Sequence, residues 1–316
     1  MNVRRTVWII AVATFTVVLL LSAGGCNRES QTPKSRIVIV TKALDSEFWQ
    51  TLKSGAEEAA RAHPDIELSV LAPEREINID QQVSILEDQI LKKVSALAVV
   101  PGGVSEIIPV LNKAKAAGIP VLIVDNDTPW PGKLTYIGTD NRAGGKLAGD
   151  FVVKTLGGHG KVAIIRGVLG VQSHEDRVAG FRGAIAQVPG IQLVTIQPGN
   201  SERALGLSVM ENIITSFPDL DAVFATNDQM ALGAMEAISA RNLSGRIHLV
   251  GFDAGKEAVR AVKAGQIDAV VAQYPANMGK QAVEAAIKAI RGEPVEKIID
   301  TGTTLVTKES ADQFLK

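Results

Sequence analysis

The sequence predicts an α/β protein with two similar lobes, each built on a doubly wound parallel sheet. Short runs of Val, Ile and Ala recur along the chain, as in strands that are buried on both faces. Amphipathic stretches fill most of the gaps between these runs, which is the pattern of parallel βαβ units. About four such units precede residue 139 and about as many follow it, so we expect two lobes with a cleft between them.

The individual elements follow from the same patterns. The expected strands are 36–40, 66–71, 96–100, 120–124, 134–138, 161–165, 191–196, 221–225, 247–251 and 268–272. Helical patterns cover, among others, 48–63, 81–93, 104–118, 141–157 and 275–292. Gly118 and Gly190 stand where a helix gives way to a strand, as expected for helix ends. The 316 residues, 46% of them apolar, are ample for two packed lobes.

The N-terminus has the layout of an export signal. Arg4 and Arg5 precede a largely apolar run over 7–21 that is short for a membrane span. The stretch LSAGGC, which ends at Cys26, resembles a bacterial lipobox, although Ala23 stands where Leu is usual. That resemblance implies cleavage before Cys26 and a lipid on its sulfur. We expect a lipoprotein signal peptide over 1–25 and a polar tether over 26–35; an ordinary signal peptide or an uncleaved anchor are the alternatives.

Several classes of function find no support in the sequence. The formal net charge is −1, so nothing indicates a nucleic-acid surface. Cys26 is the only cysteine and the four histidines lack ligand spacing, so we expect neither a disulfide nor a metal site. The glycine-rich stretch at 157–161 matches no phosphate loop, and no nucleophile motif is present. We therefore expect a monomer without a cofactor that is not an enzyme.

Polar and aromatic side chains recur after the expected strands, where ligands of open parallel sheets bind. They are Lys42, Asp45, Ser46, Phe48 and Trp49 after the first strand, Asp125 and Asn126 after 120–124, Arg177 after 161–165, Asn227 and Asp228 after 221–225, Asp253 after 247–251 and Gln273 after 268–272. Amides, carboxylates and guanidinium groups bond adjacent hydroxyls, and aromatic faces cover a sugar ring. Singly, each residue could cap a helix or pack in its lobe. Their recurrence predicts a site for a polyhydroxylated ligand.

Several motifs together resemble the bacterial ribose/allose-type periplasmic sugar-binding proteins, the solute receptors of ABC importers. They include LDSEFWQTLKSGAEEAAR, KAKAAGIPVLIVDND, AVFATNDQMALGAMEAI and VVAQYPANMG. The resemblance covers 36–308 and implies the type I periplasmic binding protein fold. It implies an N-terminal lobe of 36–139 plus 275–301 and a C-terminal lobe of 140–273 plus 303–316, joined by a three-segment hinge. It also implies a monosaccharide or related polyol ligand, an ABC transporter partner, and a place in the periplasm or on the outer leaflet of a membrane.

The resemblance further implies particular ligand contacts. They are Lys42, Ser46, Phe48, Trp49, Asp125, Asn126, Arg177, Asn227, Asp253 and Gln273. Ser46 and Glu47 replace the usual Asn-Pro before the aromatic pair, and Ser201 stands where a further aromatic contact is expected. Either the ligand differs from ribose, or another aromatic such as Trp130 compensates.

Two other functions stay open at this point. The first is an accessory protein that binds a sugar-like signal and docks on a membrane sensor. The second is an exported enzyme in which two of Asp125, Asp228 and Asp253 act as acid and base.

Overall fold

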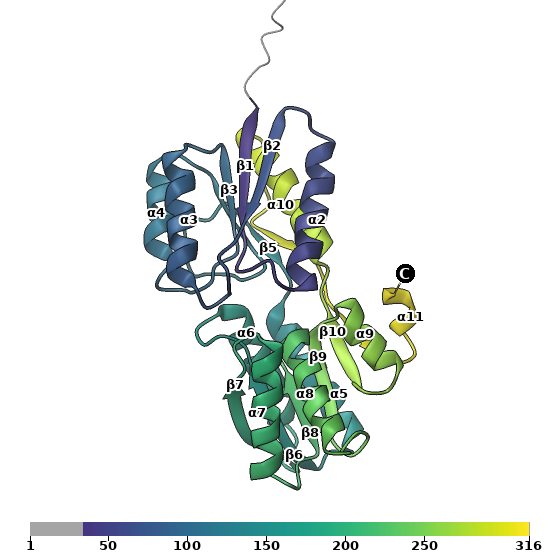
Figure 1. Cartoon of the computed structure of the whole chain (residues 1–316). Helices are drawn as coiled ribbons and strands as arrows, with labels where there is room; N and C mark the ends of the chain where they lie inside the picture. Colours follow the sequence, from purple (N-terminus) through teal and green to yellow (C-terminus); the bar gives the residue numbers. More distant parts are fainter. Residues whose placement is uncertain (1–33, 316) are drawn as a thin grey trace, which may run out of the picture. The chain divides into compact units, whose positions relative to one another are not determined.

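Two six-stranded sheets form the framework of residues 34–315, which are the residues that the computed structural model describes (Figure 1). We call each sheet with its covering helices a lobe. The expected signal peptide, Cys26 and nearly all of the tether lie outside the described residues. Ser35, which we expected in the tether, is the first residue of strand β1.

The first lobe contains a sheet in the order β11-β5-β4-β3-β1-β2, in which all neighbours are parallel. Its strands are β1 (Ser35–Val40), β2 (Ile66–Leu71), β3 (Ala96–Val99), β4 (Val121–Val124), β5 (Tyr136–Gly138) and β11 (Ile298–Asp300). Its helices are α2 (Glu47–Arg61), α3 (Ile79–Leu91), α4 (Ile108–Ala116) and α10 (Pro275–Ile290).

The second lobe repeats this order as β12-β10-β9-β8-β6-β7. Its strands are β6 (Gly160–Arg166), β7 (Ile191–Pro198), β8 (Ala222–Ala225), β9 (His248–Asp253), β10 (Ala269–Ala272) and β12 (Thr304–Thr307). Its helices are α5 (Asn141–Thr155), α6 (Gln172–Ile185), α7 (Arg203–Ser216), α8 (Asp228–Ala240), α9 (Lys256–Lys263) and α11 (Ala311–Phe314). The expected doubly wound architecture is confirmed.

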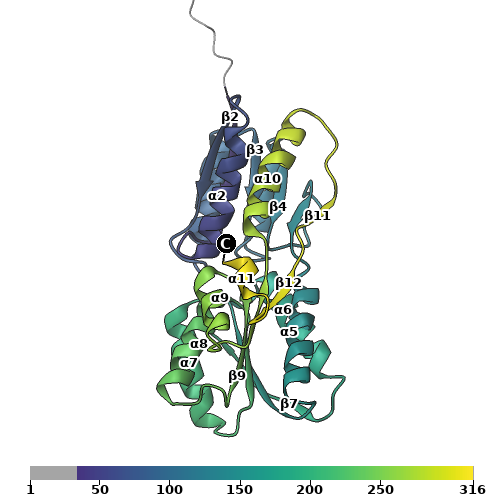
Figure 2. The ribbon, with the colours of Figure 1, turned by 90° about the vertical axis from the view of Figure 1, so that its right-hand side faces the viewer.

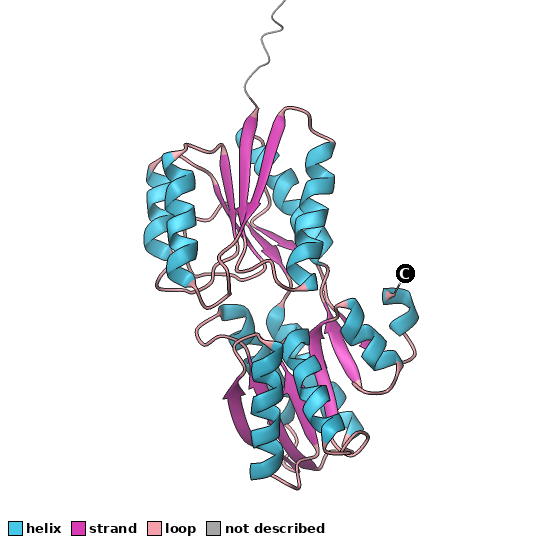
Figure 3. Cartoon of the chain, in the orientation of Figure 1, coloured by secondary structure: helices cyan, strands magenta, loops and turns pink. Residues whose placement is uncertain are grey.

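Each sheet is buried between two layers of helices, because successive strand residues point to opposite faces (Figure 3). In β1, Ile37 and Ile39 pack in the core cluster that contains Leu52 of α2. Val38 and Val40 point the other way, into the cluster that contains Leu86 of α3. The second lobe is built alike, with α5 and α6 on one face of its sheet and α7, α8 and α9 on the other.

Glycines let two helices of the second lobe approach closely. A methyl group on Gly145 of α5 would lie 2.1 Å from the carbonyl oxygen of Arg177 in α6. A methyl group on Gly180 of α6 would lie 2.0 Å from the carbonyl oxygen of Arg142 in α5. This packing holds α6, and with it Arg177, at a fixed position relative to the second sheet.

The chain crosses between the lobes three times. The crossings lie between β5 and α5, between β10 and α10, and between β11 and β12. Figure 2 shows the last of these in yellow, next to the end of α10. The sequence did not predict β11 or β12, and β12 pairs with β10 in the antiparallel sense, so the second sheet is not wholly parallel.

The strand order places a switch point in each sheet. In the first lobe, β2 and β3 lie on opposite sides of β1; in the second, β7 and β8 lie on opposite sides of β6. Connections from such neighbouring strands diverge to opposite faces, which leaves a crevice beyond the carboxyl ends of the strands. Lys42 and Phe48 follow β1, and Arg177 follows β6. The predicted contact residues therefore lie near the crevices of both lobes.

Candidate functional site

The structure gathers nearly all of the predicted contact residues in one cleft, which we call the central cleft. Nine of the ten line it. They are Lys42, Ser46, Phe48, Trp49, Asp125, Arg177, Asn227, Asp253 and Gln273. Because four of these residues come from the second lobe and five from the first, both lobes form the walls of the cleft.

The aromatic pair forms the wall of the first lobe. Phe48 and Trp49 lie in the first turn of α2, and their rings meet edge to face with 4.7 Å between centroids. Both side chains are almost completely buried, yet both border the cleft. The Trp49 indole N–H donates a 3.0 Å hydrogen bond to Oε1 of Glu76, which fixes the plane of the ring. The pair therefore offers a rigid apolar surface with a carboxylate at its edge.

Lys42 is the only cation of the first lobe in the central cleft, and it is shared between two acids. Its Nζ lies 3.8 Å from Oε2 of Glu76, 3.9 Å from Oδ2 of Asp125, and 5.3 Å from the centre of the Trp49 ring. Burial raises the pKa of Asp125 to about 6, although Lys42 and Arg177 act to lower it. Neither carboxylate is within hydrogen-bonding distance of the ammonium.

Arg177 organises the wall of the second lobe. Its Nε donates to Oδ1 of Asn141 at 2.8 Å, and Nη1 donates to the carbonyl oxygen of Thr226 at 2.7 Å. Nη1 also lies 3.2 Å from Oδ1 of Asp253, and the guanidinium stacks 3.9 Å above the centre of the Phe252 ring. Buried cations need such partners. Arg177 is thus held by a preformed network that also orients Asp253.

The remaining groups of the second lobe present amides and acids. Asn227 accepts a hydrogen bond from the Met230 backbone at 3.0 Å and so caps α8, while its Nδ2 remains beside the cleft. Gln273 donates to Oδ1 of Asp253 at 2.6 Å, and its own Oε1 has no hydrogen-bond partner. Burial, and then repulsion by Asp253, raises the pKa of Asp228 to about 8. The capping role we considered for Asn227 and its place in the cleft are therefore compatible.

Asn126 is the predicted contact that does not line the cleft. Its Nδ2 donates to the carbonyl oxygen of Pro101, and its Oδ1 accepts a 2.7 Å hydrogen bond from the backbone of Ser173 in the second lobe. Its amide is thus used by the protein itself. A role for Asn126 in ligand contact stays a prediction.

Trp130 does not replace the missing aromatic residue. Its side chain is 3% exposed, packs in the core of the first lobe, and donates to Oδ1 of Asn112. At the expected ring position, the Ser201 hydroxyl lies 3.1 Å from Nε2 of His174. Our suggestion that Trp130 compensates was wrong, and the site is open where a second ring was expected.

Four residues that line the central cleft were not among the ten predicted contacts: Glu76, Ser173, His174 and Asp228. Glu76 lies in the loop after β2, from which the sequence predicted no contact. His174 lies three residues before Arg177 on α6 and is buried. Burial, followed by Lys42 and Arg177, lowers its pKa well below the usual range, so it is neutral and bonds Thr226 and Ser201.

Two kinds of feature are absent from residues 34–315. In this range, no cluster of His, Cys, Asp and Glu side chains is arranged to hold a metal ion. No helix of the same residues is both long and apolar enough to cross a membrane.

Three polar contacts join the lobes across the cleft. One is the hydrogen bond from Ser173 to Asn126. The second is formed by Glu47 in the first turn of α2, whose Oε2 accepts a 2.8 Å hydrogen bond from the backbone N–H of Lys256 at the start of α9. The third is an ion pair between Arg75 and Glu202.

The free volume among the residues of the central cleft is about 20 Å³, enough for about one water molecule. The lobes are therefore closed on each other.

Comparison with known proteins gives a consistent relationship. Residues 37–294 match the family model of the periplasmic binding protein domain. The ribose import binding protein of Bacillus subtilis is 36% identical over 274 residues, which cover 86% of this chain and 87% of that protein. The D-ribose/D-allose-binding protein of Pseudomonas aeruginosa is 33% identical over 291 residues, which cover 88% of this chain and 91% of that one.

A solved structure supports the same relationship. A periplasmic solute-binding protein of an ABC transporter from Actinobacillus succinogenes, with bound D-allose, superimposes with a TM-score of 0.82 and 33% identity. The match covers 89% of this chain and all of that one. The described architecture and these matches lead to one conclusion: the chain belongs to the periplasmic binding protein family.

Proposed function

We propose that this protein captures a monosaccharide or related polyol between its two lobes and delivers it to an ABC importer. The composition of the central cleft carries this proposal. One wall is a rigid aromatic pair, Phe48 and Trp49, and the other bears the guanidinium, amide and carboxylate groups that bond adjacent hydroxyls. The relatives that bind ribose or allose by name support it.

Binding is favoured over catalysis by the state of the carboxylates. Asp253 is held by Arg177 and Gln273, and Asp228 accepts a 3.2 Å hydrogen bond from the backbone of Gly255. Both acids of the second lobe thus serve its own hydrogen-bond network. Long incubation of the protein with a bound sugar, followed by recovery of the unchanged sugar, is the result that the binding proposal requires.

We propose that ligand binding is coupled to opening and closing of the lobes about a hinge. The proposed lobes are 36–139 plus 275–301 and 140–273 plus 303–316, so the hinge lies at the three crossings. The central cleft supports this, because its walls come from both lobes, so a sugar ring enters between them only when the lobes separate. A ligand that bonds both walls then favours the closed state, a mechanism for which periplasmic binding proteins are a standard example.

A thermal-shift screen tests the proposed binding. The purified full-length chain is heated with pentoses, hexoses, inositols and sugar acids. A ligand at a concentration 100 times its Kd stabilises the folded state by about 2.7 kcal/mol, which is readily measured. Stabilisation by at least one compound is expected. If a folded preparation responds to none of them, the proposal is contradicted.

We also propose that the protein is a lipoprotein, attached to the outer face of a membrane through a diacylglycerol on Cys26. The small residues before this cysteine and its status as the only one in the chain support the proposal. Labelling of cells with an alkyne fatty acid should mark the wild-type chain and not the Cys26→Ser variant. Equal labelling of both would contradict lipidation at this residue.

A further inference from the structure

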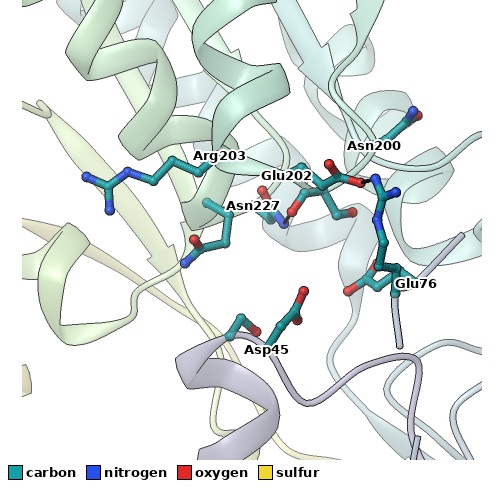
Figure 4. Close-up of a pocket in the computed structure, with 10 residues that line it drawn as sticks. Asp45, Glu76, Asn200, Glu202, Arg203 and Asn227 are labelled. Atoms are coloured by element: carbon teal, nitrogen blue, oxygen red, sulfur yellow. Dashed lines mark hydrogen bonds and ion pairs between the residues drawn. The ribbon is translucent and has the colours of Figure 1, made fainter. Parts of the chain in front are cut away.

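A second cavity opens directly beside the central cleft, and we call it the side cavity. It has a volume of about 250 Å³ and shares Ser46, Glu76 and Asn227 with the central cleft. Figure 4 shows Asp45 and Glu76 entering it from the first lobe and Glu202 and Asn227 from the second. A substituent on a ring that lies against the aromatic pair therefore has room to extend into this space.

The arginines around the side cavity are already neutralised. Arg75 pairs with Glu202 across the lobes. Arg203 pairs at 2.5 Å with Glu236 and at 2.9 Å with Glu257. Neither arginine is paired with Asp45 or Glu76. Glu76 shares Lys42 with Asp125, so one cation serves two acids, and Asp45 has no ion pair among the described residues.

The pKa of Asp45 agrees with this charge balance. Burial raises it first, and repulsion by Glu76 and Glu202 adds to the effect. Lys42 does not offset this rise in the pKa of Asp45, because Lys42 borders the central cleft and not the side cavity. A positive charge placed between these acids would be attracted by them.

Two buried carboxylate oxygens of the central cleft also lack donors. Oε1 of Glu76 accepts from Trp49, but its buried Oε2 has no hydrogen-bond partner. Oδ1 of Asp125 has none either, although that side chain is only 2% exposed. Lys42, at 3.8 and 3.9 Å, is too far to bond either acid. Buried carboxylate oxygens without a hydrogen bond require donors, and an ammonium group supplies three, together with a second positive charge for two acids that share Lys42.

We propose that the ligand is an amino-substituted sugar or cyclitol, whose protonated amine lies in the side cavity against Glu76 and Asp45. This inference rests on the proposed function and narrows its ligand class. The ring lies against Phe48 and Trp49, and the amine points past Ser46 into the side cavity. An ammonium adds the attraction of opposite charges to its hydrogen bonds with Glu76, which a neutral hydroxyl lacks, so Glu76 gives the site its preference for amines.

Titration calorimetry with the full-length chain at pH 7 tests the proposal. The probes are glucose, galactose, mannose and myo-inositol, each with its amino-substituted and N-acetylated forms. At least one amine should bind ten- to a hundredfold more tightly than its neutral parent and its N-acetyl form. In Glu76→Gln this preference should fall below threefold, because glutamine still accepts from Trp49 but carries no charge.

Glu74→Gln is the matched control, since it makes the same change at an exposed position of the same loop. It should keep the preference for the amine. If neutral sugars bind and no amine binds better, or if the N-acetyl form is preferred, the amine subsite is overturned and the proposed function stands. If no probe of any class binds, the amine subsite is overturned, and the proposed function fails as well when the thermal-shift panel of pentoses, hexoses, inositols and sugar acids gives no stabilisation.

Discussion

Replacement of Asp125 by asparagine should stabilise the ligand-free protein at neutral pH. Burial raises the pKa of this carboxyl from 3.8 to about 6, so ionising it in the folded state is costly. A difference of about 2 units corresponds to about 3 kcal/mol of unfolding free energy. Asparagine has almost the same shape, carries no charge, and tolerates the positive φ of 59° at this position.

The sign of the pH dependence follows from proton binding. Between pH 3.8 and about 6, folded Asp125 keeps a proton that the unfolded chain has lost, so the wild type loses stability as the pH rises through this window. The advantage of Asp125→Asn should therefore grow by about 3 kcal/mol from below pH 4 to pH 7 and then level off.

Urea denaturation of both proteins at several pH values measures this difference. Asp150→Asn, at an exposed pair with Lys146, controls for the loss of one surface carboxylate. The same Asp125→Asn change should weaken ligand binding about tenfold to a hundredfold, since it removes a charged acceptor. A stability difference that is constant with pH, or that falls as the pH rises, would refute the reasoning.

Three further predictions concern packing, closure and the buried cation. Gly180→Ala should destabilise the protein by about 1–3 kcal/mol, because its methyl group meets the α5 backbone. Gly183→Ala, in open space on the same helix, should instead stabilise the protein by about 0.5–1 kcal/mol. Urea denaturation of both variants measures the two changes. Glu47→Ala removes the carboxylate of α2 that accepts the hydrogen bond from the first N–H of α9 across the lobes. Calorimetry should therefore show about fivefold weaker ligand binding, while the free energy of unfolding stays nearly unchanged. Arg177→Met leaves Asp253 buried without its cation and should cost about 3–5 kcal/mol in denaturation; a loss below 1 kcal/mol would contradict the network we describe.

The sequence predicted the lobes and most of the cleft because both follow from local patterns. Buried parallel strands appear as apolar runs, and the residue after each run lies at the edge where ligands bind. The strands β11 and β12 escaped this reasoning because they are short and largely unburied, and so lack the apolar run.

The differences between the predicted and the observed cleft have tertiary causes. Asn126 follows β4 as expected, but the position of Ser173, in the other lobe, determines where its amide bonds. Trp130 lies near the site in sequence, yet the packing of α4 encloses it in the core. Glu76 becomes a site residue through the indole of Trp49, a contact between α2 and the loop after β2 that periodicity does not reveal.

The most direct test of the central claim is calorimetric titration of the purified chain with the sugar and amino-sugar panel, repeated on Trp49→Ala. Trp49 lies in the wall of the first lobe and holds Glu76, so its loss removes both the ring surface and the orientation of the acid. We predict saturable binding of one ligand per chain, weakened at least tenfold in the variant. Undiminished binding in a folded Trp49→Ala protein, or no binding to the wild type, would contradict a sugar site in the central cleft.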